Sequence, residues 1–338
     1  MADKKSINKV NNPHDGLFRK TLATRENAVS VLQHYLPGSV LDLIDLESLE
    51  ISKDSFIEKE LSDYYSDMLY KVILKGHPGF VYVLFEHKSY HDRYVHLQLL
   101  EYIVKIWRLF KNQQKKGEQP GLPVVIPLLI CHGKRPWPED GIHLSGLLNG
   151  PVKELSNYIP DFEFYLIDLT KFADENIKGT IMSRVMLLLF KYIFDPDLRT
   201  KLPEILSLMK ELMTKQTGLQ YLEIIFRYLA STIDGFSTEE IKDIFQQALS
   251  EKEGDYIMTL AEKLKEEGKI EGKIEGKIEG MIEGLHDTIE LGITLKFPEH
   301  LDDIMNRVRG IHDLNVLMEI KESIKTAENI SQILSFIK

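Results

Sequence analysis

A short apolar segment ends in charged residues whose types could support catalysis. The segment "VYVLFEHKS" (residues 81–89) begins with five apolar residues, which is typical of a buried strand, and continues with Glu86 and Lys88. Because side chains two residues apart on a strand lie on the same face, these two charged groups are expected together at the strand end. They form either a solvated strand end or a functional site.

A second strand-like run precedes this segment and supplies another carboxylate. The two runs flank Lys75-Gly76-His77-Pro78, which is a turn signal, so a β-hairpin is expected. If the turn is centred between Gly76 and His77, Asp67 lies directly opposite Glu86, with Cβ atoms roughly 4.5–5.5 Å apart. Two carboxylates at that separation repel each other unless a cation or a proton lies between them.

Asp67, Glu86 and Lys88 together form the smallest set of groups for metal-dependent hydrolysis of a phosphodiester. Mg²⁺ commonly binds one or two carboxylates and keeps waters and substrate phosphate as its other ligands. Lys88 would orient or help to deprotonate the attacking water and offset charge on the phosphate. The alternative is that Asp67 and Glu86 are separate solvated strand ends, with Glu86 paired to Lys88.

The surrounding pattern predicts an α/β domain with a central mixed sheet, followed by an all-α region. Through Cys131 the expected order is helix, strand, strand, strand, helix, strand. The expected elements of this domain are a helix over 14–36, strands over 40–51, 66–74 and 79–88, a helix over 91–114, and strands over 122–131 and 162–169. Further helices are expected over 181–194, 203–215, 218–231 and 238–250, and a small helical segment over 298–338.

A four-residue repeat, "GKIEGKIEGKIEG", occupies residues 268–280. Glycine costs about 1 kcal/mol relative to alanine inside a helix, and like charges four residues apart repel, so an isolated helix of this sequence should be weak. Packing against another helix would change this, because the glycines permit close approach and Glu and Lys could pair across. The repeat is therefore either a partly helical surface linker or an oligomerisation element. It lacks the Gly-rich loop and Lys-Ser/Thr pair of a phosphate-binding loop.

Composition limits the class of protein. The 338 residues are 43% apolar and 28% charged, which suits a soluble protein of two or three domains. The polar first 13 residues, the single cysteine and the lack of a membrane-length apolar run predict a cytoplasmic protein without a membrane partner. The net charge of −10 argues against a protein that coats nucleic acid by charge alone, but not against an enzyme with one metal-loaded cleft.

The order of these blocks resembles the PD-(D/E)xK nuclease core and, more narrowly, the recombination-promoting nuclease / putative transposase family. Asp67 and the Glu-His-Lys of residues 86–88 lie in the matching positions, although Ser66 replaces the proline of the superfamily motif. The resemblance covers roughly residues 10–200 and includes the blocks "PHDGLFRKTL", "SDMLYKV", "VYVLFEHKS", "YVHLQLLEYIVKIW" and "PVVIPLLICHGKRPW". It implies a restriction-endonuclease-like core, Mg²⁺ or alternatively Mn²⁺ as cofactor, and DNA as substrate.

Carried over by residue, the resemblance implies that Asp67 and Glu86 bind the metal and that Lys88 positions water. Asp15 on the first helix and Gln98 on the helix after the second hairpin strand are accessory candidates. Asp15 is alternatively part of a helix N-terminal cap with His14. Candidate contacts to the DNA backbone are Lys105, Arg108, Lys111, Lys134 and Arg135, which could equally be solvated basic residues.

The expected division of the chain is a flexible tail over 1–12, a nuclease domain over 13–195, a helical region over 196–266, the repeat over 267–285 and a helical segment over 286–338. The predicted function is a metal-dependent DNA endonuclease associated with recombination or mobile elements, assembled as a homo-oligomer through its helical C-terminal region. The alternative from another class is a non-catalytic protein that keeps the nuclease fold as an interaction or regulatory module. Cut-and-paste transposition is less well supported, because no DNA-recognition motif is evident.

Overall fold

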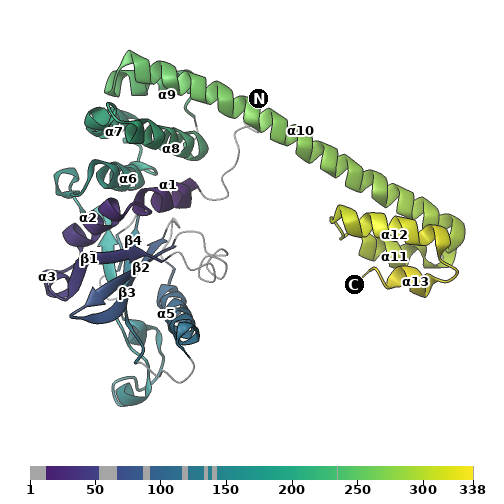
Figure 1. The fold of residues 1–338 in the computed structure, drawn as a ribbon, viewed down its shortest axis with the longest axis horizontal. Helices are drawn as coiled ribbons and strands as arrows, with labels where there is room; N and C mark the ends of the chain where they lie inside the picture. Colours follow the sequence, from purple (N-terminus) through teal and green to yellow (C-terminus); the bar gives the residue numbers. More distant parts are fainter. Residues whose placement is uncertain are drawn as a thin grey trace. The chain divides into compact units, whose positions relative to one another are not determined.

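The structure is a computed structural model that describes residues 13–52, 67–86, 92–115, 121–132, 136–138, 143–233 and 235–337, without the side chains of residues 67, 85, 86 and 271. The described residues up to 261 form one compact unit, and those from 262 onwards form a second. Each unit is described by itself (Figure 1).

A five-stranded sheet forms the centre of the first unit. Its strands follow the chain order β1 (Ile44–Ile51), β2 (Asp67–Leu74), β3 (His77–Glu86), β4 (Val124–Cys131) and β5 (Tyr165–Asp168). β2 pairs antiparallel with β1 and β3, whereas β3, β4 and β5 are parallel. This mixed sheet with flanking helices, followed by a helical C-terminal region, confirms the predicted fold class.

Helix α5 (Val95–Gln113) covers one face of the sheet. Its buried residues Leu99 and Tyr102 belong to the same core cluster as Tyr82, Leu84 and Leu129. The rings of Tyr82 and Tyr102 lie 5.0 Å apart. Because alternate residues of β3 enter this cluster, the strand follows the period-two pattern that the sequence predicted.

Helix α1 (Pro13–Leu22) packs on strand β2, where it contacts the residues that alternate with those in the cluster under α5. The Tyr70 hydroxyl donates a 2.9 Å hydrogen bond to the carbonyl of Leu22, the last residue of α1. Tyr70 follows Leu69, which lies in the cluster under α5. Since successive strand residues alternate between faces, α1 and α5 cover opposite faces of the sheet.

The expected helix over 14–36 is two helices, α1 and α2 (Arg25–Tyr35). Side chains of α2 satisfy backbone groups at the break: Asn27 Nδ2 donates to the Thr21 carbonyl at 2.9 Å. Arg25 donates to the carbonyls of Leu46 and Leu49 in β1. The Asn27 contact satisfies a carbonyl left open at the end of α1, and the Arg25 contacts attach the start of α2 to β1. A short helix, α3 (Gly38–Leu41), then precedes β1, which starts later than expected.

Four further helices complete the first unit beyond the sheet (Figure 1). They are α6 (Ile181–Tyr192), α7 (Leu198–Ser207), α8 (Gln216–Thr232) and α9 (Thr238–Ala248). Tyr221 of α8 joins α1 and α6, because its hydroxyl lies 2.9 Å from that of Thr21 and 2.8 Å from the carbonyl of Met182. Helix α8, which follows residue 195, therefore packs directly on α1.

The second unit is built on the end of the long helix α10 (Glu251–Lys296). Helices α11 (Leu301–Val308), α12 (Leu314–Thr326) and α13 (Ile330–Leu334) follow. Ile289 and Ile293 of α10 are fully buried in one core with Ile304, Leu317 and Ile320. The four-residue repeat lies inside α10, so the structure shows it as helix rather than as an irregular linker.

No helix in the described part of the chain combines the length and apolarity required to span a bilayer.

Candidate active site at the carboxyl edge of the sheet

Asp67 and Glu86 occupy the ends of the two hairpin strands. Asp67 is the first residue of β2 and Glu86 is the last residue of β3, so both lie at the same end of the hairpin. Their backbones are described and their side chains are not. Lys88 lies outside the described residues.

The hairpin register differs from the predicted one by two residues. Asp67 pairs with Leu84, not with Glu86, because Leu74 pairs with His77 around a two-residue turn. Both turn residues have positive φ, 46° for Lys75 and 85° for Gly76, as a tight hairpin turn of type I′ requires. The expectation that Asp67 and Glu86 face each other directly was therefore wrong. Glu86 instead lies two positions beyond the residue that pairs with Asp67.

The strand alternation still assigns positions 67 and 86 to one face. Leu69 of β2 and Leu84 of β3 belong to the cluster under α5, and positions 67 and 86 are each two residues further along their strands. Gln98 lies on α5, on this same face, and is half-buried. Asp15 is buried on α1, which covers the opposite face. Of the two accessory candidates, the structure thus places only Gln98 on the helix that covers the predicted site face.

Three parallel strands end together beside Glu86. Glu86 is in register with Cys131 of β4, and Cys131 is in register with Asp168 of β5. Open α/β sheets bind ligands outside the carboxyl ends of their parallel strands, so this edge is the expected location of a site. The side chain of Cys131 is buried.

Asp168 was not singled out from the sequence, and its contacts explain its burial. Its carboxylate accepts hydrogen bonds from the backbone N–H of Trp137 at 2.7 Å and from that of Thr170 at 3.0 Å. The Thr170 hydroxyl donates a third, at 2.7 Å. Asp168 thus holds the segment after β5, through Thr170, and the segment between β4 and β5, through Trp137. A strand-end Asp followed two residues later by Thr is the local signal that could have identified this turn.

The basic candidates of α5 lie along its outer part. Arg108 and Lys111 are exposed, and Lys105 Nζ lies 5.3 Å above the ring centre of Tyr102. Lys105 is therefore held in place by a cation–π contact. Lys134 and Arg135 lie outside the described residues.

An aromatic cluster next to the sheet edge joins four elements. His132, directly after β4, is stacked on Phe194, with ring centres 5.2 Å apart and planes 11° apart. Its Nδ1 donates to the Phe190 carbonyl at 3.1 Å. The ring centres of His14, on α1, and His132 lie 5.2 Å apart. His14 Nδ1 lies 3.1 Å from the Tyr228 hydroxyl of α8. His14 therefore contacts α8 and does not serve only as part of a helix cap. The residues of this aromatic cluster are too far apart in the chain for a sequence pattern to reveal the cluster.

With this geometry in view, comparison with known proteins identifies the family. The sequence pattern of the family described as "Putative transposase, YhgA-like" matches residues 12–220, which is more than half of the chain. The chain belongs to this family. The resemblance to the recombination-promoting nuclease / putative transposase family is thereby confirmed.

Three curated relatives of this YhgA-like chain come from Escherichia coli K12. The inactive recombination-promoting nuclease-like protein RpnE is 31% identical over 261 residues, covering 77% of this chain and 83% of RpnE. The recombination-promoting nucleases RpnC and RpnA are each 28% identical, over 76% of this chain and 82% and 84% of theirs. No solved structure matches the chain.

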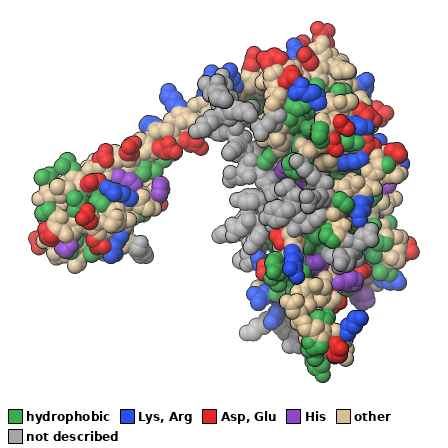
Figure 2. Space-filling view, turned by 180° about the vertical axis from the view of Figure 1, so that it is seen from behind, with side chains coloured by type: hydrophobic (Ala, Val, Ile, Leu, Met, Phe, Trp, Pro, Cys, Tyr) green, Lys and Arg blue, Asp and Glu red, His purple; other side chains and the backbone are tan. Residues whose placement is uncertain are grey.

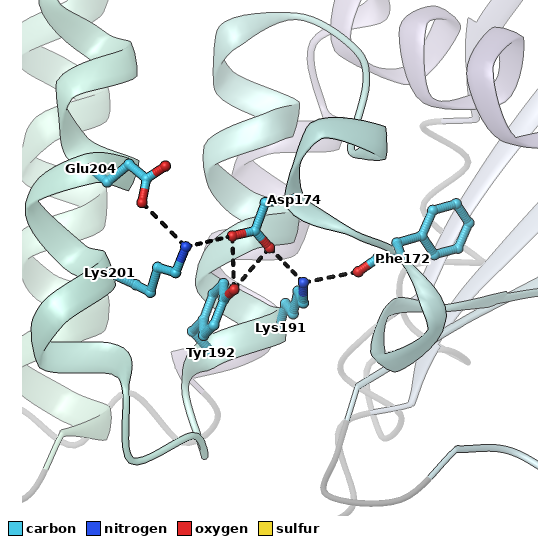
Figure 3. A network of polar contacts seen from close by, with 6 residues as sticks. All are labelled: Phe172, Asp174, Lys191, Tyr192, Lys201 and Glu204. Carbon is cyan, nitrogen blue, oxygen red and sulfur yellow. Dashed lines mark hydrogen bonds and ion pairs between the residues drawn. The ribbon is translucent and has the colours of Figure 1, made fainter.

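The part that matches the YhgA-like family also contains a dense polar cluster, shown in Figure 3. Asp174 accepts hydrogen bonds from Lys191, from the Tyr192 hydroxyl at 2.7 and 2.8 Å, and from Lys201 at 3.0 Å. Burial opposes ionisation of Asp174, but hydrogen bonds from Lys191, Tyr192 and Lys201 outweigh it and lower its pKa to about 2.

The partners of Asp174 respond in the opposite direction. Burial and the hydrogen bond to Asp174 raise the pKa of Tyr192 to about 12. Hydrogen bonds to Asp174 and Glu204 raise the pKa of Lys201. Asp174 thus stays ionised, Tyr192 stays neutral and Lys201 stays protonated near neutral pH. The cluster joins α6, α7 and the segment after β5. Its donors and acceptors are used within the protein, which marks it as structural rather than catalytic.

Proposed function

We propose that this protein is a metal-dependent DNA endonuclease that hydrolyses phosphodiester bonds at the carboxyl edge of its sheet. One observation carries the proposal. Asp67 and Glu86 lie at the ends of two adjacent strands, and these ends belong to the edge of the sheet where the parallel strands end. Relatives named recombination-promoting nucleases support this function and its association with DNA recombination or mobile elements.

Positions 67 and 86 fit a shared divalent cation better in the observed register than in the predicted one. Diagonal neighbours on adjacent strands have Cα atoms roughly 7–8 Å apart, and their Cβ atoms are somewhat closer. Carboxylates at that separation can converge on one cation without being pressed against each other. Oxygen donors of this kind suit Mg²⁺ or Mn²⁺, and the cation would activate water and stabilise charge on the phosphate.

The remaining groups of the chain have assignable roles in this proposal. Lys88 would hold the attacking water and place positive charge beside the phosphate. Gln98 would hydrogen-bond at the site from α5. Arg108 and Lys111, exposed on the same helix, would hold the DNA backbone, together with Lys105, Lys134 and Arg135.

A cleavage assay on plasmid DNA in Mg²⁺ tests this function. Asp67→Asn and Glu86→Gln should each slow cleavage on the order of 10²-fold or more, as loss of a charge-stabilising group at a reaction centre does. Glu50→Gln is the matched control, because Glu50 is an exposed acid of the same sheet, on β1. Cleavage by Asp67→Asn at the parent rate would refute the assignment.

The name of RpnE favours a second candidate, since that relative is described as inactive. In this alternative the chain keeps the fold and serves as an interaction or regulatory module. A thermal melt with and without Mg²⁺ separates the two candidates. An active site should give a Mg²⁺-dependent rise in melting temperature that Asp67→Asn abolishes, whereas a module without a metal site should give none in either protein.

We further propose that the protein acts in the cytoplasm, where DNA is accessible to it, and that cleavage rather than strand transfer is its reaction. The single, buried cysteine agrees with a reducing compartment. An assay with labelled donor and target DNA would detect joined products if strand transfer occurred.

A further inference from the structure

The beginning of α5 exposes two apolar side chains. Tyr94, the residue directly before α5, is 61% exposed, and Leu97 in the first turn is 48% exposed. Residues three apart at the start of a helix are neighbours, so the two side chains form one small apolar surface. Isolated apolar residues are common on protein surfaces, so the location of this pair decides its meaning.

Helix α5 begins at the carboxyl edge of the sheet and ends at the amino edge. Its first residue, Val95, comes shortly after Glu86 in the chain. Nearer its other end, Trp107 Nε1 donates a 2.8 Å hydrogen bond to the carbonyl of Pro123, directly before β4. Because β3 and β4 are parallel, the start of β4 belongs to the amino edge. Tyr94 therefore lies at the end of α5 that is nearer the proposed site.

The contacts of α5 also show which flank of the helix is nearer β2. The His96 ring lies on one flank, with its centre 4.9 Å from that of Phe164, directly before β5. Gln98 is two residues further, about 200° around the helix, and lies on the other flank. Tyr94 precedes Gln98 by four residues and shares its flank. Since the sheet order runs from β1 to β5, this flank is the one nearer Asp67.

The backbone at Tyr94 is held in place, whereas its ring is exposed. Asp92 Oδ1 accepts a 2.9 Å hydrogen bond from the Tyr94 N–H. The Tyr94 carbonyl accepts hydrogen bonds from the N–H groups of Leu97, at 2.9 Å, and Gln98, at 3.2 Å. Tyrosine has only two side-chain torsions, so a ring on a fixed backbone loses little conformational entropy when it binds a ligand.

The charges around this apolar surface disfavour a phosphate there. Glu101, four residues after Leu97, is exposed, and Asp92 is half-buried just before Tyr94. Arg93 is exposed as well and offsets only one of these two acids. On the face in Figure 2, the described Lys and Arg side chains are interspersed with acidic ones and form no continuous basic patch. The nucleobase, which is uncharged, is therefore the part of a DNA strand that best fits this surface.

A nucleobase can stack on Tyr94 only where it is not enclosed in a duplex. Within intact B-DNA both faces of a base are covered by its neighbours, and proteins reach only base edges, sugars and phosphates. Unpaired bases expose their faces, and stacking on an aromatic side chain strengthens binding roughly 5- to 150-fold per base. This gain does not depend on charge, which suits a chain with a net charge of −10.

We propose that Tyr94, supported by Leu97, stacks on an unpaired nucleobase next to the phosphate that is cleaved. The inference rests on the proposed nuclease function and specifies its substrate class, which is DNA with unpaired bases at the cleavage position. Tyr94 binds substrate in this arrangement and takes no part in the chemical step.

Binding of fluorescein-labelled DNA, measured by anisotropy without divalent cations, tests the contact independently of cleavage. Two duplexes of one sequence are compared, one fully paired and one with a central bubble of unpaired bases. The parent should bind the bubble at least about 5-fold more tightly. Tyr94→Ala should weaken binding to the bubble on the order of 10-fold and binding to the paired duplex less than about 2-fold. Tyr94→Phe, which keeps the ring, should bind like the parent.

Tyr158→Ala is the matched control. Tyr158 is 84% exposed in the same unit, but it lies in the connection that leads to the amino end of β5. This variant should bind both duplexes like the parent. Tyr94→Ala should keep the melting temperature of the parent, because the side chain that it removes is exposed.

Three binding results would overturn the proposal. They are an unchanged affinity of Tyr94→Ala for the bubble, an equal loss on both duplexes, and a parent that binds neither duplex. Cleavage in Mg²⁺ is measured separately: the parent should cut the bubble faster than the paired duplex, and Tyr94→Ala should lose that preference. A parent that discriminates in binding but cuts neither duplex would refute the nuclease function and not the base contact.

Discussion

Helix α5 and the repeat of α10 are both amphipathic, but the apolar row of α5 is buried and that of the repeat is exposed to solvent. In α5 the buried residues Val95, Leu99, Tyr102 and Ile106 are spaced four, three and four residues apart. Eleven residues make just over three turns, so this row stays on one face. In the repeat every step is four residues, so the row advances about 40° around the helix at each step.

The difference shows that hydrophobic content does not decide burial by itself. A straight row matches a flat surface such as the sheet, whereas a winding row can meet a partner only over a short crossing. The chain covers the straight row with its own sheet. It leaves most of the winding row exposed.

Truncating one leucine of the straight row should have the largest effect. Leu99 of α5 is fully buried against the sheet, so Leu99→Ala should lower the free energy of unfolding by about 2–5 kcal/mol. Ile274→Ala, in the winding row, should change the first unit by no more than about 0.5 kcal/mol. Tryptophan fluorescence in urea measures this, because both tryptophans, Trp107 and Trp137, lie in the first unit. Equal losses would contradict the comparison.

A glycine-to-alanine pair gives the next largest contrast. A Cβ atom on Gly218 in α8 would clash with the carbonyl oxygen of Leu212, so Gly218→Ala should destabilise the first unit by about 1–3 kcal/mol. Gly276→Ala meets no atom and should stabilise α10 by about 1 kcal/mol through helix propensity. Urea unfolding measures both changes, by fluorescence for Gly218→Ala and by circular dichroism for Gly276→Ala. The two changes in the free energy of unfolding should have opposite signs.

Substitution of the charged residue Asp174 should change the stability of the first unit by a smaller amount than the core substitutions. The pKa of Asp174 is below that of an unfolded chain, so its contribution is fully present above about pH 4 and is lost as the pH falls toward about 2. Asp174→Asn should therefore lower stability at neutral pH by on the order of 1–2 kcal/mol, and this difference should shrink below pH 4. Urea titrations across this range provide the measurement.

Glu204→Gln is the control for that experiment. Glu204 makes an exposed ion pair with Lys201, and such pairs contribute little. A loss as large as that of Asp174→Asn, or one that does not depend on pH, would argue against the Asp174 cluster as the source of the effect.

Local periodicity was sufficient to predict the order of strands and helices, because apolar spacing distinguishes them directly. It was not sufficient for the hairpin register. The sequence Lys75-Gly76-His77-Pro78 allows more than one turn. The pairing of Leu74 with His77 and the positive φ of Lys75 and Gly76 show which one forms. A two-residue error in register changed the expected partner of Asp67 but not the face assigned to it.

Contacts between distant segments were the least predictable. Tyr221 and Tyr228 of α8 reach Thr21 and His14 of α1 across 200 and 214 residues. No spacing rule connects such positions, since the contact depends on how the helices stack. The position of Asp15 on the face away from α5 was unpredictable for the same reason.

The span between α1 and α8 also bears on synthesis. The sheet strands are neighbours in chain order, so the sheet can assemble as the chain emerges. Helix α1 leaves the ribosome before the sheet and α8, and it gains its α8 contacts only after about 200 further residues, roughly 10–40 s later at ordinary elongation rates. Its apolar side chains Leu17, Phe18 and Leu22, buried in the finished protein, lack the α8 layer during that interval. The nascent chain is thus expected to be a client of ribosome-associated chaperones until α8 closes over α1.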